Sequence, residues 1–175
     1  MNMKSEFKKI SIIGLGNIGR YIAKLLNSFN VKIKGFDPYL LNNYEYEGLN
    51  IQFCDTLQDS LEDTNIVFLC CNLTHDNFKF MNKNIFSKLN QVNLINVGRG
   101  NLINEDDLLD AMINGQIAAC ALDVYSSEPL PHNSKLRNSN KIVFGTHSAG
   151  QTYEAIEKVN QLAIENLYPL KEDSL

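Results

Sequence analysis

Four charged or titratable side chains follow runs of apolar residues in the second half of the chain. They are Arg99, Asp123 with Glu128, and His147. A guanidinium, a carboxylate and an imidazole around one crevice can bind an anionic substrate, orient a ring and move a proton. Each could also be an ordinary loop residue, and Glu128 before Pro129 is the easiest to interpret as a solvated charge. We therefore predict acid–base chemistry on an anion, provided that the fold brings these residues to one edge.

Three glycines near the N-terminus predict a nucleotide site. The apolar run from Lys9 stops at Gly14, Gly16 and Gly19, which have the spacing G-x-G-x-x-G. In a strand that turns into a helix, Gly14 permits the tight turn, Gly16 lets a pyrophosphate approach the backbone, and Gly19 allows close packing of the helix. The unpaired amides from about Asn17 onward, with the positive end of the helix dipole, would form an anion site.

Asp37 ends the next apolar run, about 20 residues after the glycines, where a carboxylate accepts hydrogen bonds from an adenosine ribose. This carboxylate would repel a 2′-phosphate, so NAD is favoured over NADP. The alternative is that Asp37 and Pro38 only open a turn. The strand, helix and strand around the glycines favour the dinucleotide site.

Alternating strands and helices must position these residues. After the glycine motif we expect strands at 31–36, 51–53, 65–71, 92–97, 117–124 and 142–144. We expect helices at 56–61, with Asp55 as N-cap, at 82–89, from Asn104 to a closing Gly115, and at 151–168. This alternation predicts an α/β fold, a doubly wound parallel sheet of Rossmann type with helices on both faces. Ligands would bind outside the carboxyl ends of its strands.

The composition limits the classes of protein. A chain of 175 residues, with 44% hydrophobic and 21% charged residues, is predicted to be a single globular domain over 1–175. Its net charge of −4 argues against non-specific nucleic-acid binding. The cysteines lack C-x-x-C spacing, so we expect no metal site. Cys70, Cys71 and Cys120 lie in apolar runs, where reduced, buried thiols are expected.

Targeting signals are also not expected. Residues 1–9 are polar, and the apolar run that follows is too short for a signal peptide and ends in glycines. No segment has the length and apolarity to span a bilayer. These features predict a cytoplasmic protein that does not contact membranes.

The chain resembles the D-isomer-specific 2-hydroxyacid dehydrogenases. The resemblance is carried by GLGNIGRYIA, by FDPY at 36–39, by NVGRGNLINEDDLLDAMINGQIAACALDVYSSEPLP at 96–131 and by THSAGQT at 146–152. It covers nearly the whole chain but only the NAD-binding domain of that family. In the family, residues before the glycine motif build a substrate domain. Only residues 1–7 precede the first expected strand here, so we expect that domain to be largely absent.

The resemblance implies roles for single residues. Arg99 would hold the substrate carboxylate and carbonyl oxygen, His147 would exchange a proton with the hydroxyl, and Glu128 would pair with His147. The implied cofactor is NAD, and the implied substrate is a small 2-hydroxy or 2-keto acid. Beyond the three glycines, the implied cofactor contacts are Asn17 and Ile18 at the diphosphate, Asp37 at the ribose, Val97, Gly98, Arg99, Asp123, His147, Ser148, Ala149 and Gly150 around the nicotinamide, and Asn72 and Thr74 nearby.

Two positions depart from the family pattern. Thr146 and Asn72 stand where the family usually or often has proline, which loosens the backbone there. The assembly implied by the family is a homodimer, and a separate chain could supply the substrate domain.

Two other functions are compatible with parts of this pattern. One is a non-catalytic NAD(H)-binding or sensing module, which would retain the same residue types. The other is a Rossmann-type methyltransferase, against which the set of Arg99, Glu128 and His147 argues. Tighter binding of S-adenosylmethionine than of NADH would favour the methyltransferase.

Overall fold

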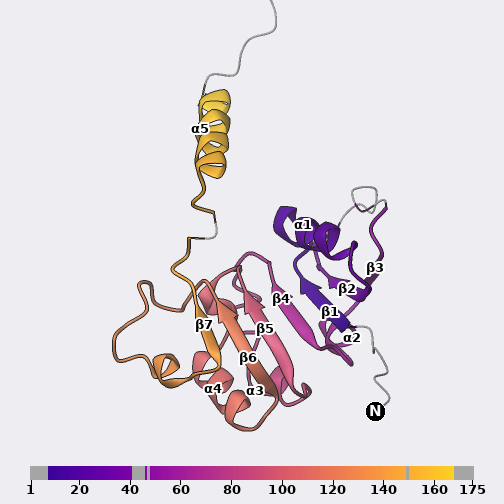
Figure 1. The fold of residues 1–175 in the computed structure, drawn as a ribbon, viewed down its shortest axis with the longest axis vertical. Helices are drawn as coiled ribbons and strands as arrows, with labels where there is room; N and C mark the ends of the chain where they lie inside the picture. The colour runs from indigo at the N-terminus through magenta and orange to yellow at the C-terminus, as the bar shows by residue number, and fades with distance from the viewer. Residues whose placement is uncertain (1–7, 41–45, 47, 149, 168–175) are drawn as a thin grey trace, which may run out of the picture.

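Seven parallel strands form one sheet in the order β3-β2-β1-β4-β5-β6-β7 (Figure 1). The structure is a computed structural model that describes residues 8–40, 46, 48–148 and 150–167. The strands are β1 Lys8–Ile13, β2 Val31–Phe36, β3 Ile51–Phe53, β4 Ile66–Leu69, β5 Val92–Asn96, β6 Ile117–Leu122 and β7 Ile142–Phe144. The helices are α1 Asn17–Leu26, α2 Leu57–Leu61, α3 Lys83–Phe86, α4 Glu105–Ile113 and α5 Tyr153–Leu167, with 3-10 turns η2 Gly100–Leu102 and η3 Lys135–Asn138. The predicted doubly wound parallel sheet is confirmed.

The strand order reverses between β1 and β4. The chain runs outward from β1 to β3 and then crosses to β4 on the other side of β1. Ile13 at the end of β1 is in register with Phe36 of β2 and with Leu69 of β4. The carboxyl ends of these three strands are therefore level, which opens a crevice at the reversal, where ligands of such sheets bind.

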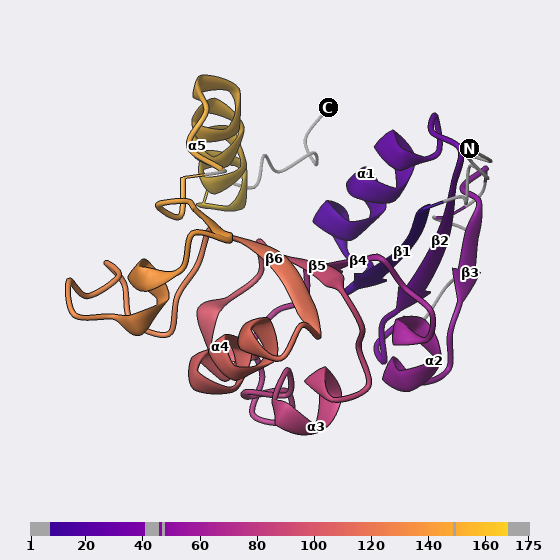
Figure 2. The ribbon, with the colours of Figure 1, turned by 60° about the horizontal axis from the view of Figure 1, so that its bottom comes forward.

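Helices cover both faces of the sheet, as predicted. Figure 2 shows α1 on one side of the sheet and α2, α3 and α4 on the other. The larger core contains Leu61 of α2, Phe86 of α3 and Leu108 of α4, whereas the smaller core joins Ala23 of α1 to Ile12. The sheet thus separates two apolar cores. Packing on both faces holds the strands, and therefore their carboxyl ends, in place.

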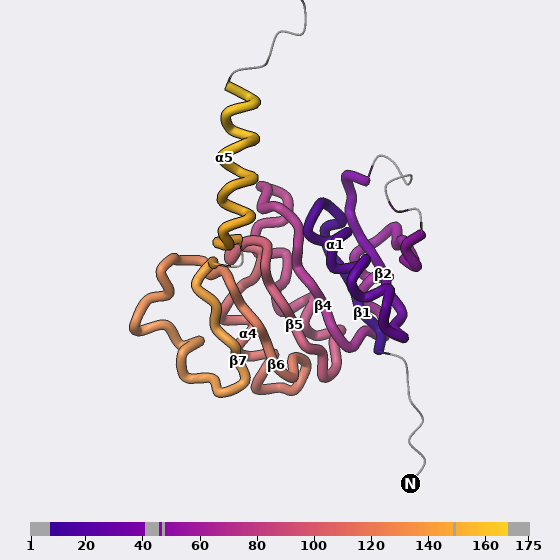
Figure 3. The backbone as a smooth tube through the Cα atoms, turned by 45° about the horizontal axis from the view of Figure 1, so that its top comes forward, coloured from indigo at the N-terminus to yellow at the C-terminus, as the bar shows by residue number. Residues whose placement is uncertain are grey.

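Helix α5 lies apart from both cores. It projects away from the sheet beyond β7 (Figure 3), and none of its residues is buried. The sequence predicts this helix from residue 151 to 168; it begins at Tyr153, and Tyr168 lies outside the described residues. Among the described helices, none has the length and apolar character needed to cross a membrane.

Several predicted boundaries are wrong by a few residues. Thr56, not Asp55, caps α2, because its side chain accepts a hydrogen bond from the Asp59 N–H. Strands β4, β5 and β6 end two, one and two residues earlier than the apolar runs that predicted them. Cys70 and Cys71 consequently lie beyond β4 and are only partly buried, whereas Cys120 in β6 is buried as expected.

Candidate active site

The turn at Gly14 and the close packing of the helix at Gly19 are as predicted. Gly14 has φ of +91°, and a Cβ there would lie 2.5 Å from the Cys71 nitrogen. A Cβ on Gly19 would lie 2.0 Å from the Gly14 carbonyl oxygen, so α1 packs directly on the turn. A Cβ on Gly16 would meet nothing within 4 Å. Gly14 and Gly19 are therefore required by the fold, whereas Gly16 faces open space.

A cavity of about 490 Å³ lies at the strand reversal. It is lined by Gly14, Gly16, Asp37, Asn72 and Thr74, together with apolar side chains that include Phe36, Leu57 and Phe80. Five of the predicted cofactor residues thus share one cavity. Cys70 and Cys71 also line it, and burial raises their thiol pKa values to about 12 and about 11, so both thiols are protonated at neutral pH.

The Asp37 carboxylate is fixed by backbone groups. Its Oδ2 accepts a hydrogen bond from the Leu15 N–H at 2.9 Å, and its Oδ1 accepts one from the Tyr39 N–H at 3.0 Å. The bond from Tyr39 closes the turn that the alternative interpretation of Asp37 predicted. Asp37 therefore opens a turn and also lines the cavity. Each oxygen keeps a further lone pair for a ribose hydroxyl.

These features fit a dinucleotide. The ten-residue helix α1 begins at Asn17, and its N-cap, Gly16, makes no side-chain capping bond. The open space in front of Gly16, which a side chain would fill, leads to the first turn of the helix, where amides and dipole favour an anion. On this surface, Asn17 Oδ1 accepts a bond from Arg20 at 2.5 Å, and Ile18 is exposed.

The loop after β4 is held by an asparagine that the sequence analysis did not identify. Asn77 Oδ1 accepts a hydrogen bond from the Thr74 N–H at 2.7 Å, and its Nδ2 donates to the Asn72 carbonyl at 2.8 Å. Asn77 therefore fixes both predicted cofactor residues of this loop. A polar residue three positions after Thr74 in a short loop was the available signal.

A second missed residue, Asn96, shapes the turn that carries Arg99. Asn96 is fully buried at the end of β5, where its Oδ1 accepts a bond from the Gly98 N–H at 3.1 Å and its Nδ2 donates to the Arg99 carbonyl at 3.0 Å. The Arg99 side chain is exposed and donates from Nη1 to the Gly98 carbonyl at 2.7 Å. An asparagine that ends an apolar run before Gly-Arg-Gly was the signal for this role.

His147 and Glu128 form a pair beyond β6 and β7. The His147 Nδ1 lies 2.7 Å from Glu128 Oε2, and the other oxygen, Oε1, accepts a bond from the Tyr125 N–H at 3.0 Å. Because the carboxylate can only accept, it favours the proton on Nδ1 and leaves Nε2 for a ligand. The His147 N–H donates to the Asp123 carbonyl at 2.8 Å, and its φ of +56° is strained for a non-glycine residue, as is common at functional sites.

Arg99 follows β5, which is the neighbour of β6 in the parallel sheet, so its segment leaves the same edge of the sheet. The pKa of Glu128 is lowered from 4.5, first by the hydrogen bond with His147, then by the Tyr125 N–H and by the charges of His147 and Arg99, while burial opposes the shift. The Arg99 charge thus acts on the carboxylate that pairs with His147. The three predicted catalytic residues, which come from three different strand ends, converge at one edge of the sheet.

The remaining predicted residues lie along this edge. Val97 and Gly98 follow β5, and Asp123 follows β6. The Ser148 N–H reaches Asp123 Oδ1 at 3.4 Å, and a Cβ on Gly145 would lie 2.2 Å from the same oxygen. Gly150 is exposed, and Ala149 lies outside the described residues.

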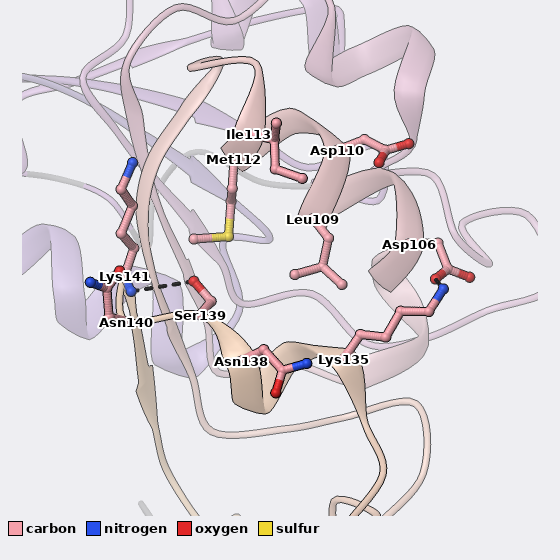
Figure 4. A pocket seen from close by; sticks show the side chains of 10 residues that line it. All are labelled: Asp106, Leu109, Asp110, Met112, Ile113, Lys135, Asn138, Ser139, Asn140 and Lys141. Atoms are coloured by element: carbon pink, nitrogen blue, oxygen red, sulfur yellow. Dashed lines mark hydrogen bonds and ion pairs between the residues drawn. The ribbon is translucent and has the colours of Figure 1, made fainter.

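Two other hollows surround the second half of the sheet. One of about 240 Å³ lies beside His147 and is lined by Tyr125, Pro129, Arg137 and Phe144, among others. The other, of about 650 Å³, lies between α4 and η3, where Lys135 reaches Asp106 at 3.1 Å (Figure 4). None of the predicted site residues lines this second hollow. In the described part of the chain, no three His, Cys, Asp or Glu side chains are grouped as metal ligands.

Comparison with known proteins identifies similar chains. The family model of the D-isomer specific 2-hydroxyacid dehydrogenase, NAD binding domain, matches residues 2–149. A glyoxylate reductase of Thermofilum pendens is 37% identical over 161 residues, which are 91% of this chain and 47% of that protein. A glyoxylate reductase/hydroxypyruvate reductase of Mus musculus is 35% identical over 162 residues, 90% of this chain and 48% of that protein. The chain therefore spans about half the length of these curated relatives.

A solved structure agrees with this match. A D-isomer specific 2-hydroxyacid dehydrogenase from Polaromonas sp. JS6 66 superposes with a TM-score of 0.84 at 26% identity. The superposition covers 94% of this chain and 51% of that one. The similarity therefore extends across the described sheet and again involves about half of the larger protein.

Proposed function

The chain belongs to the D-isomer specific 2-hydroxyacid dehydrogenase family as an NAD-binding domain, and from that premise we propose that it serves hydride transfer between NAD and a small 2-hydroxy or 2-keto acid. The observation that carries the proposal is the pair of His147 and Glu128, at 2.7 Å, at the edge of the sheet where Arg99 follows the neighbouring strand β5. A substrate with a carboxylate, placed at this edge of the sheet, would contact the Arg99 cation and the His147 imidazole, which can carry a proton.

Each of the three residues has a proposed role. The exposed Arg99 guanidinium binds the substrate carboxylate, for which its planar donors are suited. His147 donates a proton from Nε2 to the carbonyl oxygen during reduction and accepts it from the hydroxyl during oxidation. Glu128 fixes the tautomer of His147 and stabilises the protonated ring.

The cofactor would be held by residues of the 490 Å³ cavity and its rim. Asp37 would accept hydrogen bonds from the adenosine ribose, and the first amides of α1 would bind the diphosphate. The loop of Asn72 and Thr74, with Val97, Gly98, Asp123 and Ser148, would line the path toward His147. When bound, NAD supplies the hydride chemistry.

The substrate class is suggested by the curated relatives, two of which are named glyoxylate reductases. We infer that the substrate is a small 2-keto acid of this kind. The region of those relatives that this chain does not match would supply the rest of the substrate site, on the same polypeptide or on a separate one. We expect the 175 residues alone to bind NADH and to turn over slowly, because closure around the substrate excludes water and completes such sites.

NADH binding followed by fluorescence tests the cofactor site. We expect Asp37→Ala to weaken NADH binding about ten-fold or more, equivalent to about 1.4 kcal/mol. Asp76→Ala is the matched control, because it removes an exposed carboxylate from the wall of the same cavity. Tighter binding of S-adenosylmethionine than of NADH would contradict the proposal.

NADH oxidation with a panel of 2-keto acids, glyoxylate and hydroxypyruvate included, tests the chemistry. We expect Arg99→Met to raise KM for the keto acid and His147→Asn to lower kcat, with NADH affinity retained in both. NADH binding with no turnover of any 2-keto acid, even with a relative's substrate domain added, would instead favour the non-catalytic NAD(H)-binding module.

A further inference from the structure

Tyr125 lies at the centre of the three converging strand ends. It follows β6, its side chain is only 7% exposed, and its ring stacks on Phe144 of β7 with centroids 6.4 Å apart. Tyr125 is not among the site residues predicted from the sequence. It contacts the segments of all three residues to which the proposed function assigns chemistry.

The hydroxyl of Tyr125 joins two strand ends. Its oxygen lies 2.9 Å from the Leu122 carbonyl and 2.8 Å from the Gly145 carbonyl, so one O–H is shared between the last residue of β6 and the residue that follows β7. Strand β7 has three residues and lies at the edge of the sheet, where β6 is its neighbour. Together with the Gly145 N–H bond to the Leu122 carbonyl and the His147 N–H bond to the Asp123 carbonyl, this hydroxyl ties the His147 segment to the end of β6.

The backbone of Tyr125 contacts the other two segments. Its N–H donates to Glu128 Oε1 at 3.0 Å. A Cβ on Gly100 would lie 1.8 Å from the Tyr125 carbonyl carbon, so the residue after Arg99 packs directly against this backbone. A displacement of Tyr125 would therefore move Glu128 and the Arg99 turn together.

We propose that Tyr125 is a positioning residue, and that its hydroxyl sets the separation of the His147 imidazole from the Glu128 carboxylate by joining the ends of β6 and β7. Its catalytic consequence rests on the proposed function, whereas its geometric consequence does not. The effect on the pair is expected to be large because Glu128 is already held on the Tyr125 N–H. The His147 backbone is bonded to the Asp123 carbonyl, so the imidazole side chain is the part of the pair that can move.

Tyr125→Phe is the appropriate variant, because it retains the ring, its burial and its stacking and removes only the O–H. In the full chain we expect the carboxyl ¹³C titration of Glu128 to shift, with its pKa rising toward the ordinary value of 4.5 as the bond to His147 lengthens. The downfield imidazole N–H proton of the pair should broaden or disappear. Glu128→Gln assigns the carboxyl signal.

Tyr46→Phe is the matched control. The hydroxyl of Tyr46 is also buried and donates to a carbonyl, that of Leu15 at 2.7 Å, but at the glycine turn. Both variants should unfold at a lower urea concentration than the wild type, because each loses one buried hydrogen bond. Only Tyr125→Phe should change the titration of Glu128. If Tyr125→Phe is destabilised but the titration of Glu128 is unchanged, Tyr125 has only a structural role and the proposal is overturned.

Turnover separates this proposal from the proposed function. If the wild-type chain reduces a 2-keto acid, Tyr125→Phe should lower kcat about ten-fold with KM for NADH unchanged, since acid–base groups contribute about 10²–10⁴ in rate. An unchanged kcat would contradict the positioning role. If the wild type stays inactive even with a relative's substrate domain added, but the Glu128 titration still shifts in Tyr125→Phe, the dehydrogenase proposal fails and the positioning of the pair is supported.

Discussion

Single residues at this site are held by backbone groups on the protein itself. Asp37 accepts two backbone N–H bonds, Glu128 accepts one, and Asn96 bonds to both Gly98 and Arg99. Groups fixed in this way need little reorganisation when a ligand arrives, which is the condition for strong electrostatic effects in a site. The binding groups at this edge of the sheet are therefore already ordered before a ligand binds, because folding of the domain has fixed them.

Acid should remove the contribution of Glu128 to stability. Its pKa is lowered in the folded protein, chiefly by the His147 hydrogen bond, so its contribution is present above the ordinary pKa of 4.5 and is lost as the pH falls through the lower folded value. The side chain is 35% exposed, so we expect a contribution well below 1 kcal/mol. Urea unfolding between pH 7 and pH 3 measures it.

Glu128→Gln should be less stable than the wild type at pH 6, and the two should converge at the acid end of this range. Glu157→Gln is the control, because Glu157 is exposed on α5 and is remote in sequence from the pair. Curves for Glu128→Gln and wild type that stay parallel down to pH 3 would contradict the assignment.

The chemically distinctive residues could be predicted, and their supports could not. Arg99, Glu128 and His147 were identified because their types are suited to anion and proton chemistry and because they follow apolar runs. Asn96 bonds to Gly98 and Arg99, two and three residues later in the chain, whereas Tyr125 bonds to groups that are brought close by strand pairing, such as Gly145 beside Leu122. A linear pattern carries no record of such contacts.

Among the elements, β1 and α1 approach each other closely at the glycine turn. Gly19→Ala should destabilise the chain by about 1–3 kcal/mol or more, because its Cβ would lie 2.0 Å from the Gly14 carbonyl oxygen and the helix would have to move. Gly16→Ala should keep wild-type stability, since its Cβ meets nothing within 4 Å, but should weaken NADH binding. Urea unfolding and NADH fluorescence test both variants, and equal stability losses would contradict this distinction.

Helix α2 tests which residue caps a helix. Thr56→Ala should cost about 1 kcal/mol, because the Thr56 hydroxyl accepts the Asp59 N–H at 3.1 Å. Asp55→Ala, one position earlier, should cost a few tenths at most. Thermal unfolding of the two variants decides between the adjacent capping candidates. A greater loss for Asp55→Ala would restore the sequence-based prediction of the cap.

The element boundaries show what apolar patterning measures. Each apolar run reports burial, and residues past the end of a strand can still be buried, as Val124 is beyond β6. The predicted helix at 82–89 contains only a four-residue α3, although Phe86 and Leu89 are both buried. Existence and order of the elements could therefore be predicted from spacing, whereas strand pairing and exact ends depend on hydrogen bonds between distant residues.

Across the whole molecule, apolar side chains remain exposed on the α1 face of the sheet. Ile18, Leu25 and Phe29 are exposed on or just after α1. Ile142 is buried in the core beneath α4, so its neighbour Val143, which is 70% exposed, points to the α1 face. The described residues thus cover one face of β5–β7 better than the other.

Helix α5 provides the test at this scale. Because none of its residues is buried, removing everything after Gly150 should expose no core surface, and we expect Tm to change by less than about 2 °C. The truncated chain would still contain the matched residues 2–149 and should bind NADH as the full chain does. Leu136→Ala is the contrast, because Leu136 of η3 is 1% exposed and its truncation should cost about 2–5 kcal/mol. A large fall in Tm on removal of α5 would mean that the helix packs on the domain in solution.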